Sequence, residues 1–526
     1  MRTVRRLVGP VVAVSGAAIA AGRFRRVGYM DETPLASFEK DVELINWSST
    51  HELSTKSLYQ PESTEELVNT LKQCQEDGLR IRPMGSGLSP NGIGFDQEGT
   101  VSMGLLDNIL SVNKEKKTVR VQAGVKVSQL VEFLRPYNLT LQNYASIAEQ
   151  QIGGFVQVGA HGTGMDIPPV DMQVLSMKVL TPGLGMIELN EEKNPILFKL
   201  ARVALGSLGV MVEATIQCVD AHLLKEHTFV STAEQIRANH DEWLRSHQHL
   251  RYMWIPYSES VIVVWSDPAG ADEAVGESTV FSEEEALAAP RALLRSARPE
   301  IEDEQLKELS FTQIRDELIH HKPLDAEHIR EVNQAEAEYW RKKEGVRVDW
   351  SDRILGFDCG GQQWVSEVAF PCGSKEKPST SDLDFIDDVK KIIEEEKIPA
   401  PAPIEQRWTS ASSSYLSPVW SSDLESVFSW VGIIMYLPPA GEVGDEERGR
   451  ITEAFQGYQQ KLETELWERY GAFEHWAKIE ATSPLLKQKK ERIQRRLPMV
   501  MYESTRKLLD PQHILSNNAI EAILSD

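Results

Sequence analysis

Three glycine-rich segments in the first half of the chain constrain its fold more than any other feature. The first, RPMGSGLSPNG at residues 82–92, follows the alternating run LRIRP. A Rossmann-type dinucleotide-binding turn needs G-x-G-x-x-G leading directly into an amphipathic helix. Gly85 and Gly87 fit that pattern, but Pro90 occupies the third glycine position, and the residues that follow have no helical period. This loop is therefore not a simple Rossmann turn.

The other two segments are NYASIAEQQIGGFVQVGAHGTG at residues 143–164 and ALGSLGVMVEATI at residues 204–216. Glycine lets backbone N–H groups approach a ligand closely and form concavities for anionic oxygens. No segment contains the Lys-Ser/Thr pair of a P-loop. Each cluster alone is typical of an ordinary turn, but three in one domain favour a long pyrophosphate cofactor lying across it.

The rest of the chain indicates an α+β protein of two domains. A capping box from Ser63 to Glu66 predicts one helix, and KVSQLVEFLRPYN predicts a second. Strands and helices then alternate irregularly to about residue 222, unlike a βαβ repeat. The remainder contains the strand-like runs SVIVVWS, QWVSEVAF and VGIIMYL, and an acidic stretch at residues 268–305 that we expect to be a solvated surface insertion.

The N-terminal residues 1–45 have the composition of a targeting leader. Six arginines precede the first acidic residue, Asp31, and an uncharged run of sixteen residues lies between Arg6 and Arg23. An arginine-rich, acid-free leader is typical of mitochondrial import. The apolar run is shorter than the roughly 20 residues of a membrane span, which leaves a sorting signal or a weak anchor. A secretory signal is the alternative, because AIAAG resembles a cleavage site.

Charge and cysteine content exclude other classes. With 56 basic and 79 acidic residues the net charge is −23, which argues against nucleic-acid binding and would speed encounter with a basic protein, although solubility alone explains it too. The four cysteines form no C-x-x-C pair, so we expect free, mostly buried thiols. The histidine pairs HQH (His247, His249) and HH (His320, His321) have no cysteine or carboxylate at metal-ligand spacing nearby, and we predict no metal site.

Two sets of motifs resemble a known family. RPMGSGLS resembles the first pyrophosphate loop of vanillyl-alcohol-oxidase-type flavoproteins, and residues 145–164 resemble the segment beneath their flavin. Four later motifs resemble the sugar-lactone oxidoreductase branch, in particular its plant and algal dehydrogenases for L-galactono-1,4-lactone: PAPIEQRW, FSWVGIIMYLP, HWAKIE and LDPQHILSNN. The resemblance implies an FAD-binding domain at residues 46–222 and a substrate-binding cap domain at residues 223–526.

The resemblance also implies how FAD is held. Leu88 stands where many relatives carry a histidine that bonds covalently to flavin, so we expect non-covalent FAD. Ala145 matches a position near flavin C4a at which oxidases carry glycine, and its methyl group would keep oxygen from reduced flavin. The residues expected to contact FAD are Arg82, Pro83, Met84, Gly85, Ser86, Gly87, Leu88, Ser89, Ser146, Gly153, Gly154, Gly159, His161, Gly162, Thr163, Gly206 and Gly209.

Three further residues acquire catalytic roles from the resemblance. Glu405 and Arg407 would share one face of a strand, where an exposed ion pair is the alternative interpretation. Glu405 would bind substrate hydroxyls, and Arg407 would bind the lactone and stabilise negative charge on reduced flavin. Lys478 would be a second cationic contact and Ser146 a hydroxyl partner, whereas His161 could be structural, a flavin neighbour or a catalyst.

The implied activity is FAD-dependent oxidation of L-galactono-1,4-lactone at C2 to L-ascorbate. The implied electron acceptor is cytochrome c, a basic protein, at the mitochondrial inner membrane or in the intermembrane space, with a possible association with respiratory complex I. Two alternatives are an aldonolactone oxidase that produces hydrogen peroxide and an assembly or accessory protein of complex I.

Overall fold

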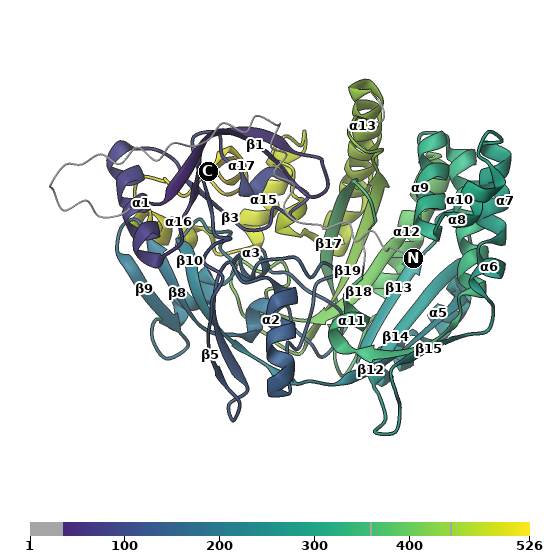
Figure 1. Cartoon of the computed structure of the whole chain (residues 1–526), viewed down its shortest axis with the longest axis horizontal. Coiled ribbons are helices and arrows are strands. Elements are labelled where there is room, and N and C mark those ends of the chain that lie inside the picture. Colours follow the sequence, from purple (N-terminus) through teal and green to yellow (C-terminus); the bar gives the residue numbers. More distant parts are fainter. Residues whose placement is uncertain (1–34, 358–359, 442–443, 526) are drawn as a thin grey trace.

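The computed structural model of the protein describes residues 35–357, 360–441 and 444–525. Two α+β halves lie beside each other (Figure 1). Most of the predicted leader lies outside the described residues. Its last residues form strand β1 (Ser37–Ile45), which pairs antiparallel with β2 (Glu52–Gln60) and is therefore part of the first domain. The first domain therefore begins before residue 46, at β1.

Two main sheets build the first domain. The four-stranded sheet has the order β1-β2-β4-β3, with β3 at Arg82–Met84 and β4 at Thr100–Ser102. The five-stranded sheet has the order β5-β6-β10-β8-β9. Its strands are β5 (Ile109–Asn113), β6 (Thr118–Gln122), β10 (Val210–Gln217), β8 (Val174–Thr181) and β9 (Gly185–Asn190), and the short strands β7 (Leu139–Thr140) and β11 (Val219–Asp220) pair beside it.

Both helices predicted for this domain are confirmed. In α1 (Thr64–Asp77) the Ser63 hydroxyl accepts a hydrogen bond from the Glu66 backbone N–H, while the Glu66 carboxylate accepts from Glu62, one residue earlier than a capping box requires. The second predicted helix is α2 (Val127–Leu134). Two short helices complete the domain, α3 (Ile152–Gln157) and α4 (Pro195–Ala201).

A nine-stranded sheet forms the second domain, in the order β15-β16-β12-β14-β13-β18-β19-β17-β20. Its strands are β12 (Leu223–Thr232), β13 (His249–Trp254), β14 (Ser260–Pro268), β15 (Gly276–Thr279), β16 (Gly345–Trp350), β17 (Gln363–Ser374), β18 (Ile404–Ser410), β19 (Ser426–Tyr436) and β20 (Phe473–Glu474). One face packs against α5 (Ala233–Ser246), α12 (Ser381–Glu395) and α13 (Asp445–Leu462) in a shared hydrophobic core. Because side chains alternate along each strand, the opposite face is separate from this core, and part of it lines a cavity.

The acidic stretch at residues 268–305 is part of a helical subdomain. Exposed acidic residues do cover much of it, but Ala286, Leu287 and Leu294 are buried in a small core. The subdomain comprises α6 (Glu283–Ala286), α7 (Ala288–Ala297), α8 (Asp303–Glu308), α9 (Phe311–His321) and α10 (Ala326–Lys342), at the right of Figure 1. The short helix α11 (Ser351–Leu355) follows β16.

The end of the chain returns to the first domain, where its helices (yellow in Figure 1) lie beside the N-terminal strands. Ile81 donates a backbone hydrogen bond to Ile514, and the Asn517 side-chain amide donates to the carbonyls of Ile93 and Phe95. The motif LDPQHILSNN, assigned from the sequence to the second domain, therefore supports the first glycine-rich loop. The helices here are α15 (Leu486–Arg496), α16 (Met499–Leu509) and α17 (Asn518–Leu524), and the small α14 (Glu468–Tyr470) precedes β20.

Cys74, Cys218 and Cys372 are buried free thiols, as predicted, and Cys359 lies outside the described residues. Within the described ranges, no helix combines the length and apolar character needed to cross a membrane.

Candidate active site

A cavity of about 670 Å³ lies between the two domains. The three glycine-rich segments line it on one side, and strands β13, β17, β18 and β19 of the nine-stranded sheet line it on the other. Of the residues predicted to contact cofactor or substrate, most reach this cavity. They are Arg82, Pro83, Met84, Gly85, Ser86, Gly87, Leu88, Ser89, Ala145, Ser146, Gly153, Gly154, His161, Gly206, Glu405, Arg407 and Lys478.

Four residues predicted to contact the cofactor do not line the main cavity. Gly162 and Thr163 border a much smaller void behind it, and the Thr163 hydroxyl hydrogen-bonds to the Leu250 carbonyl. A Cβ on Gly209 would approach Val179 to 2.3 Å, and Gly159 has a positive φ of 68°. These glycines serve close packing and turn geometry of the wall rather than lining it.

Arg82 lines the cavity but its guanidinium is committed to the protein. It donates to the carbonyls of Ile93, Leu205 and Leu515, which come from three separate loops. Burial lowers the pKa of Arg82 to about 10. The side chain therefore braces the first and third glycine-rich loops against the C-terminal segment.

The cavity wall beside these loops has open space for a ligand and hydrogen-bond acceptors without partners. A Cβ on Gly154 would meet open space, so the backbone there stands directly against the cavity. Gly206 has a φ of 72°, and a Cβ there would lie 2.9 Å from Pro83. The Oε1 atoms of Gln150 and Gln151, both on the wall, are buried without a hydrogen-bond partner. Buried acceptors of this kind normally have partners, so the wall is suited to a ligand with several hydrogen-bond donors.

On the opposite wall the predicted pair Glu405 and Arg407 does lie on one strand, β18, facing the cavity. The pair is not the exposed ion pair of the alternative interpretation, because Arg407 is only 8% exposed. Arg407 Nη2 lies 3.4 Å from Glu405 Oε2 and 2.7 Å from Glu367 Oε1. Lys478 Nζ lies 2.9 Å from the other oxygen of Glu367.

Glu367 is the central residue that sequence reasoning missed. It lies on β17 in the run QWVSEVAF, where period-2 alternation places Gln363, Val365 and Glu367 on one face. All three line the cavity. An acid inside an otherwise apolar strand was the available signal, because carboxylates are seldom buried without a partner.

The sheet register explains how these charges meet. Glu367 on β17 and Glu405 on β18 both pair with Gly432 of the intervening strand β19. The three residues form one row across the sheet, and only the two outer ones carry side chains. Gly432 therefore leaves a gap in the cavity floor, and its missing Cβ would have no neighbour nearer than the Ser366 carbonyl at 3.9 Å.

Lys478 is held in place from the first domain. The Asn91 side-chain amide, in the first glycine-rich loop, donates to the carbonyls of Trp476 and Ile479. The Asn91 backbone N–H donates to the Ala477 carbonyl. The segment Trp476–Lys478 is a single 3-10 turn, so His475 and Lys478 lie one turn apart, as the sequence predicts if helical.

Burial and charge set the protonation of the cluster. Burial alone would raise the pKa of Glu367, but Lys478, His161 and Arg407 hold it well below the ordinary value of 4.5. Burial lowers the pKa of His161, and burial together with the charge of Lys478 lowers that of His475 further. At neutral pH Glu367 is therefore ionised and both imidazoles are neutral.

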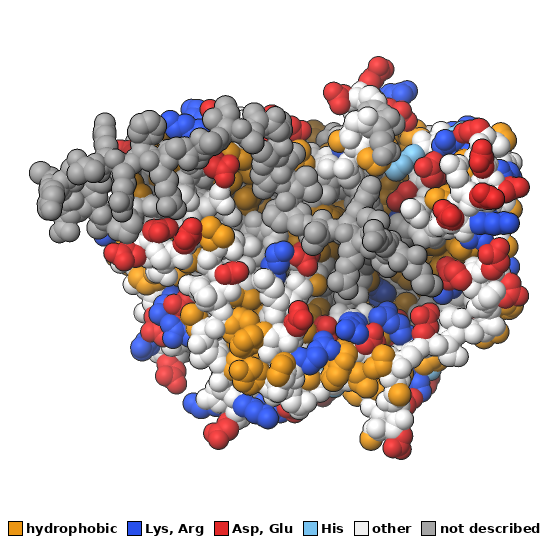
Figure 2. Space-filling view, viewed as in Figure 1, with side chains coloured by type: hydrophobic (Ala, Val, Ile, Leu, Met, Phe, Trp, Pro, Cys, Tyr) orange, Lys and Arg blue, Asp and Glu red, His pale blue; other side chains and the backbone are white. Residues whose placement is uncertain are grey.

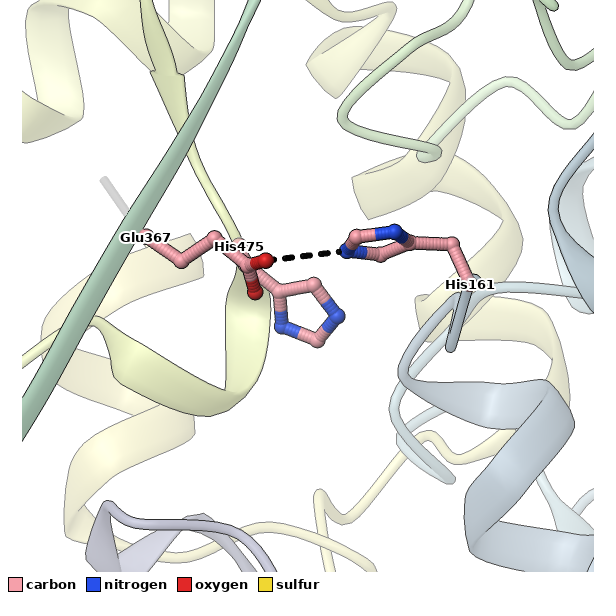
Figure 3. A group of neighbouring side chains, drawn as sticks. All are labelled: His161, Glu367 and His475. Atoms are coloured by element: carbon pink, nitrogen blue, oxygen red, sulfur yellow. Dashed lines mark ion pairs between the residues drawn. The ribbon is translucent and has the colours of Figure 1, made fainter. Parts of the chain in front are cut away.

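His161, Glu367 and His475 converge from three different segments (Figure 3), and their ligand atoms lie within 4.8 Å of one another. His161 Nε2 is 3.3 Å from Glu367, and its ring stacks on Trp430 with centroids 3.7 Å apart. His475 Nδ1 already accepts the Ala477 N–H. Arg407 and Lys478 occupy both oxygens of Glu367, and two adjacent cations disfavour a metal ion. Glu367 is therefore the centre of ion pairs with Arg407 and Lys478, with His161 and His475 as neutral neighbours, rather than part of a metal centre.

The predicted oxygen gatekeeper, Ala145, borders the same cavity. Ala145 is half-buried and packs against the core of the first domain, and Ser146 follows it on the wall. The Ser146 carbonyl accepts a hydrogen bond from Phe357, whose ring lies 4.2 Å beneath the guanidinium of Arg251. Arg251 in turn lies 3.8 Å from Glu405. Neither Arg251 nor Phe357 was predicted, because each reaches the site only through the tertiary fold.

Two family models match the chain. One, described as an FAD binding domain, matches residues 55–189, and the other, described as D-arabinono-1,4-lactone oxidase, matches residues 214–523. The mitochondrial L-galactono-1,4-lactone dehydrogenase of Brassica oleracea is 50% identical over 504 residues, which cover 93% of this chain and 84% of that protein. L-Galactono-1,4-lactone dehydrogenase 2 of Oryza sativa is 49% identical over 91% of this chain and 83% of its own length.

The chain also resembles two more distant proteins. L-Gulonolactone oxidase of Mus musculus is 27% identical over 84% of this chain and 89% of its own. The solved structure of cholesterol oxidase from Brevibacterium sterolicum superposes with a TM-score of 0.71 at 14% identity, covering 93% of this chain and 98% of that one. This last likeness concerns the fold alone. It confirms the predicted two-domain α+β fold, and the match to an FAD binding domain confirms FAD as the cofactor.

Proposed function

This chain belongs to the family of L-galactono-1,4-lactone dehydrogenases and D-arabinono-1,4-lactone oxidases, and from that membership we propose that it oxidises L-galactono-1,4-lactone at C2 to L-ascorbate and passes the electrons to cytochrome c. It is an FAD-dependent aldonolactone dehydrogenase. The observation that carries the choice of substrate class is the charged floor of the cavity. There Glu405, Arg407 and Lys478 face the glycine-rich loops across a space left open by Gly432.

The residues present fit FAD. The three glycine-rich loops leave backbone exposed to the cavity at Gly154, and the buried acceptors of Gln150 and Gln151 suit the imide and hydroxyl donors of this cofactor. Leu88 lines the cavity where a covalent link would require a nucleophile, which supports non-covalent binding. When bound, FAD supplies the hydride-accepting chemistry, and the protein supplies orientation and charge.

The remaining steps fall to side chains of the cavity floor. Oxidation at C2 removes a hydride, for which FAD would be the acceptor, and the hydroxyl proton, which would leave to water, and the resulting 2-keto lactone tautomerises to ascorbate. Glu405 accepts hydrogen bonds from substrate hydroxyls, and the Arg407 guanidinium donates to the lactone oxygens. Three cations, Arg251, Arg407 and Lys478, face two carboxylates, so the floor has one excess positive charge. Fixed positive charge in a cavity stabilises negative charge that develops during reaction.

Charge and the gatekeeper support cytochrome c as the acceptor. The chain has a net charge of −23, and Figure 2 shows acidic side chains over the helical subdomain at the right of the view. Exposed acids there include Glu284, Glu302, Asp303, Glu304 and Glu308. Opposite charges steer a basic protein to such a surface. The methyl group of Ala145 on the cavity wall would hinder oxygen as a competing acceptor.

The mitochondrial names of the relatives support a mitochondrial location, and the inner membrane or intermembrane space remains our proposal for its place there. Association with respiratory complex I stays a prediction.

The visible spectrum of the purified protein tests the proposed function. We expect yellow protein with flavin released by denaturation, bleaching when L-galactono-1,4-lactone is added without oxygen, and recovery of the colour when cytochrome c is added. The rate of recovery should fall with rising salt, because screening weakens long-range attraction. Recovery with oxygen and release of hydrogen peroxide, at a rate equal to that with cytochrome c, would instead identify an oxidase.

Gly432 gives a second test, directed at the substrate. We expect Gly432→Val to raise the KM for the lactone at least about tenfold, because the valine side chain would fill the open space at the cavity floor. The flavin content should stay unchanged, because Gly432 lies on a β-strand and strands accommodate valine well. Steady-state kinetics measure this. Gly276→Val is the matched control, since Gly276 also lies on a strand with open space around it but away from the cavity. An unchanged KM in Gly432→Val would place the lactone elsewhere.

A further inference from the structure

Glu367 is a buried acid at the floor of the cavity. It is 4% exposed, and three groups surround its carboxylate: Arg407 at 2.7 Å, Lys478 at 2.9 Å and His161 at 3.3 Å. Each cation takes a different oxygen. Glu405, by comparison, is more exposed and pairs at 3.4 Å or more with its two arginines.

The contacts of Glu367 are unsuited to binding substrate or taking a proton. Both oxygens already accept charge-assisted hydrogen bonds, which leaves few lone pairs for a substrate hydroxyl. A carboxylate held ionised by two cations is also a weak base. Its chemistry is therefore that of a fixed counter-ion.

We propose that Glu367 is a positioning residue for lactone oxidation, a buried carboxylate that fixes the Arg407 guanidinium and the Lys478 ammonium side by side at the cavity floor and sets the excess charge there at one. This inference rests on the proposed function, which supplies the reaction for which the two cations are positioned.

The backbone reinforces this role. Strand β20 pairs with β17 next to Glu367, and the His475 backbone N–H donates to the Glu367 carbonyl at 2.9 Å. The turn that carries Lys478 is thus attached to Glu367 through both main chain and side chain. On the other side, the side-chain-free position Gly432 separates Glu367 from β18, and across that gap Arg407 reaches it.

Removing this one charge should disturb both cations together. Without the carboxylate, two like charges would face each other in a buried site, where their repulsion is poorly screened. The excess positive charge of the floor would rise from one to two. Breaking a buried ion pair by deleting one partner is costly because the other is left uncompensated.

The test is a double-mutant cycle of Glu367→Gln with Lys478→Met in the FAD-loaded protein. We expect Glu367→Gln to lower kcat/KM for the lactone about 100-fold, mainly through kcat. If Glu367 acts through Lys478 and Arg407, the double variant should be barely slower than the slower single variant. A Glu367→Gln protein at wild-type rate, or effects that simply multiply in the double variant, would overturn the proposal.

A second measurement does not depend on turnover. Loss of a negative charge beside the cavity should shift the midpoint potential of the bound flavin to a more positive value, whereas a purely structural role would leave it unchanged. Glu480→Gln is the matched control, because Glu480 pairs with His51 and does not line the cavity. An unshifted potential in Glu367→Gln would contradict the proposal.

Failure of the proposed function and failure of the proposed role of Glu367 would give different results. A wild-type protein that fails to bleach with lactone refutes the function, while the potentials still report on the charge of Glu367. If Glu367→Gln does not fold, Glu367→Asp decides the matter, because it keeps the charge but its shorter side chain reaches one cation at most. We then expect about a tenfold lower kcat, and a wild-type kcat would overturn the proposal.

Discussion

Replacing Arg407 with alanine is expected to lower kcat/KM for L-galactono-1,4-lactone by about 10³-fold, the upper range for losing one preorganised donor at a reacting centre. The guanidinium lies between Glu367 and Glu405 at the cavity floor, so its loss would remove the proposed contact to the lactone and one of the two cations that pair with Glu367. Steady-state and anaerobic single-turnover kinetics of the lactone reaction measure the effect.

Arg407→Lys is the matched control for charge. Lysine keeps the charge but presents a single ammonium group in place of a planar fork, so it cannot contact both carboxylates as arginine does. We expect an intermediate rate. Equal rates for the lysine and alanine variants would mean that geometry alone matters, and a wild-type rate for Arg407→Ala would remove Arg407 from the catalytic machinery.

Replacing Ala145 with glycine is expected to raise the rate at which oxygen reoxidises the reduced protein, by about tenfold or more. Ala145 lines the cavity and packs against the core of the first domain, where spare space is scarce. We therefore expect that removing its methyl group gives dioxygen easier access to the reduced cofactor. Stopped-flow mixing of the lactone-reduced protein with oxygenated buffer measures the rate.

Ala148→Gly controls for the added backbone freedom that any glycine brings. Ala148 belongs to the same segment but is exposed and does not line the cavity. Oxygen reactivity should rise in Ala145→Gly only. Equal rises in both variants would assign the effect to loop mobility, and no change in either would show that a different group excludes oxygen.

Local patterns were sufficient for some elements of the fold and for several site residues. The Ser63 cap predicted α1, strand-like runs predicted β14, β17 and β19, and the i, i+2 spacing placed Glu405 and Arg407 on one face of a strand. These signals are local because hydrogen bonds within a helix and alternation along a strand depend on near neighbours.

Local patterns also misplaced two segments. Residues 37–45 were included within the bounds of the predicted leader, but they form an edge strand whose exposed residues need no apolar period. The motif LDPQHILSNN follows the second domain in sequence yet packs on the first, where Ile81 donates a hydrogen bond to the Ile514 carbonyl and Arg82 to the Leu515 carbonyl.

The sequence by itself determined that this chain contains three glycine-rich loops suited to a pyrophosphate cofactor, a strand that presents an acid and an arginine together, and a lysine one turn beyond a histidine. Only the tertiary structure decided that Glu367 pairs with Arg407 and Lys478. It also decided that Gly432 leaves a gap between Glu367 and Glu405, and that Asn91 of the other domain holds the segment that carries Lys478. The physical reason is that strand register and domain contact bring together residues far apart in the chain, and no spacing rule along the sequence records which strands become neighbours.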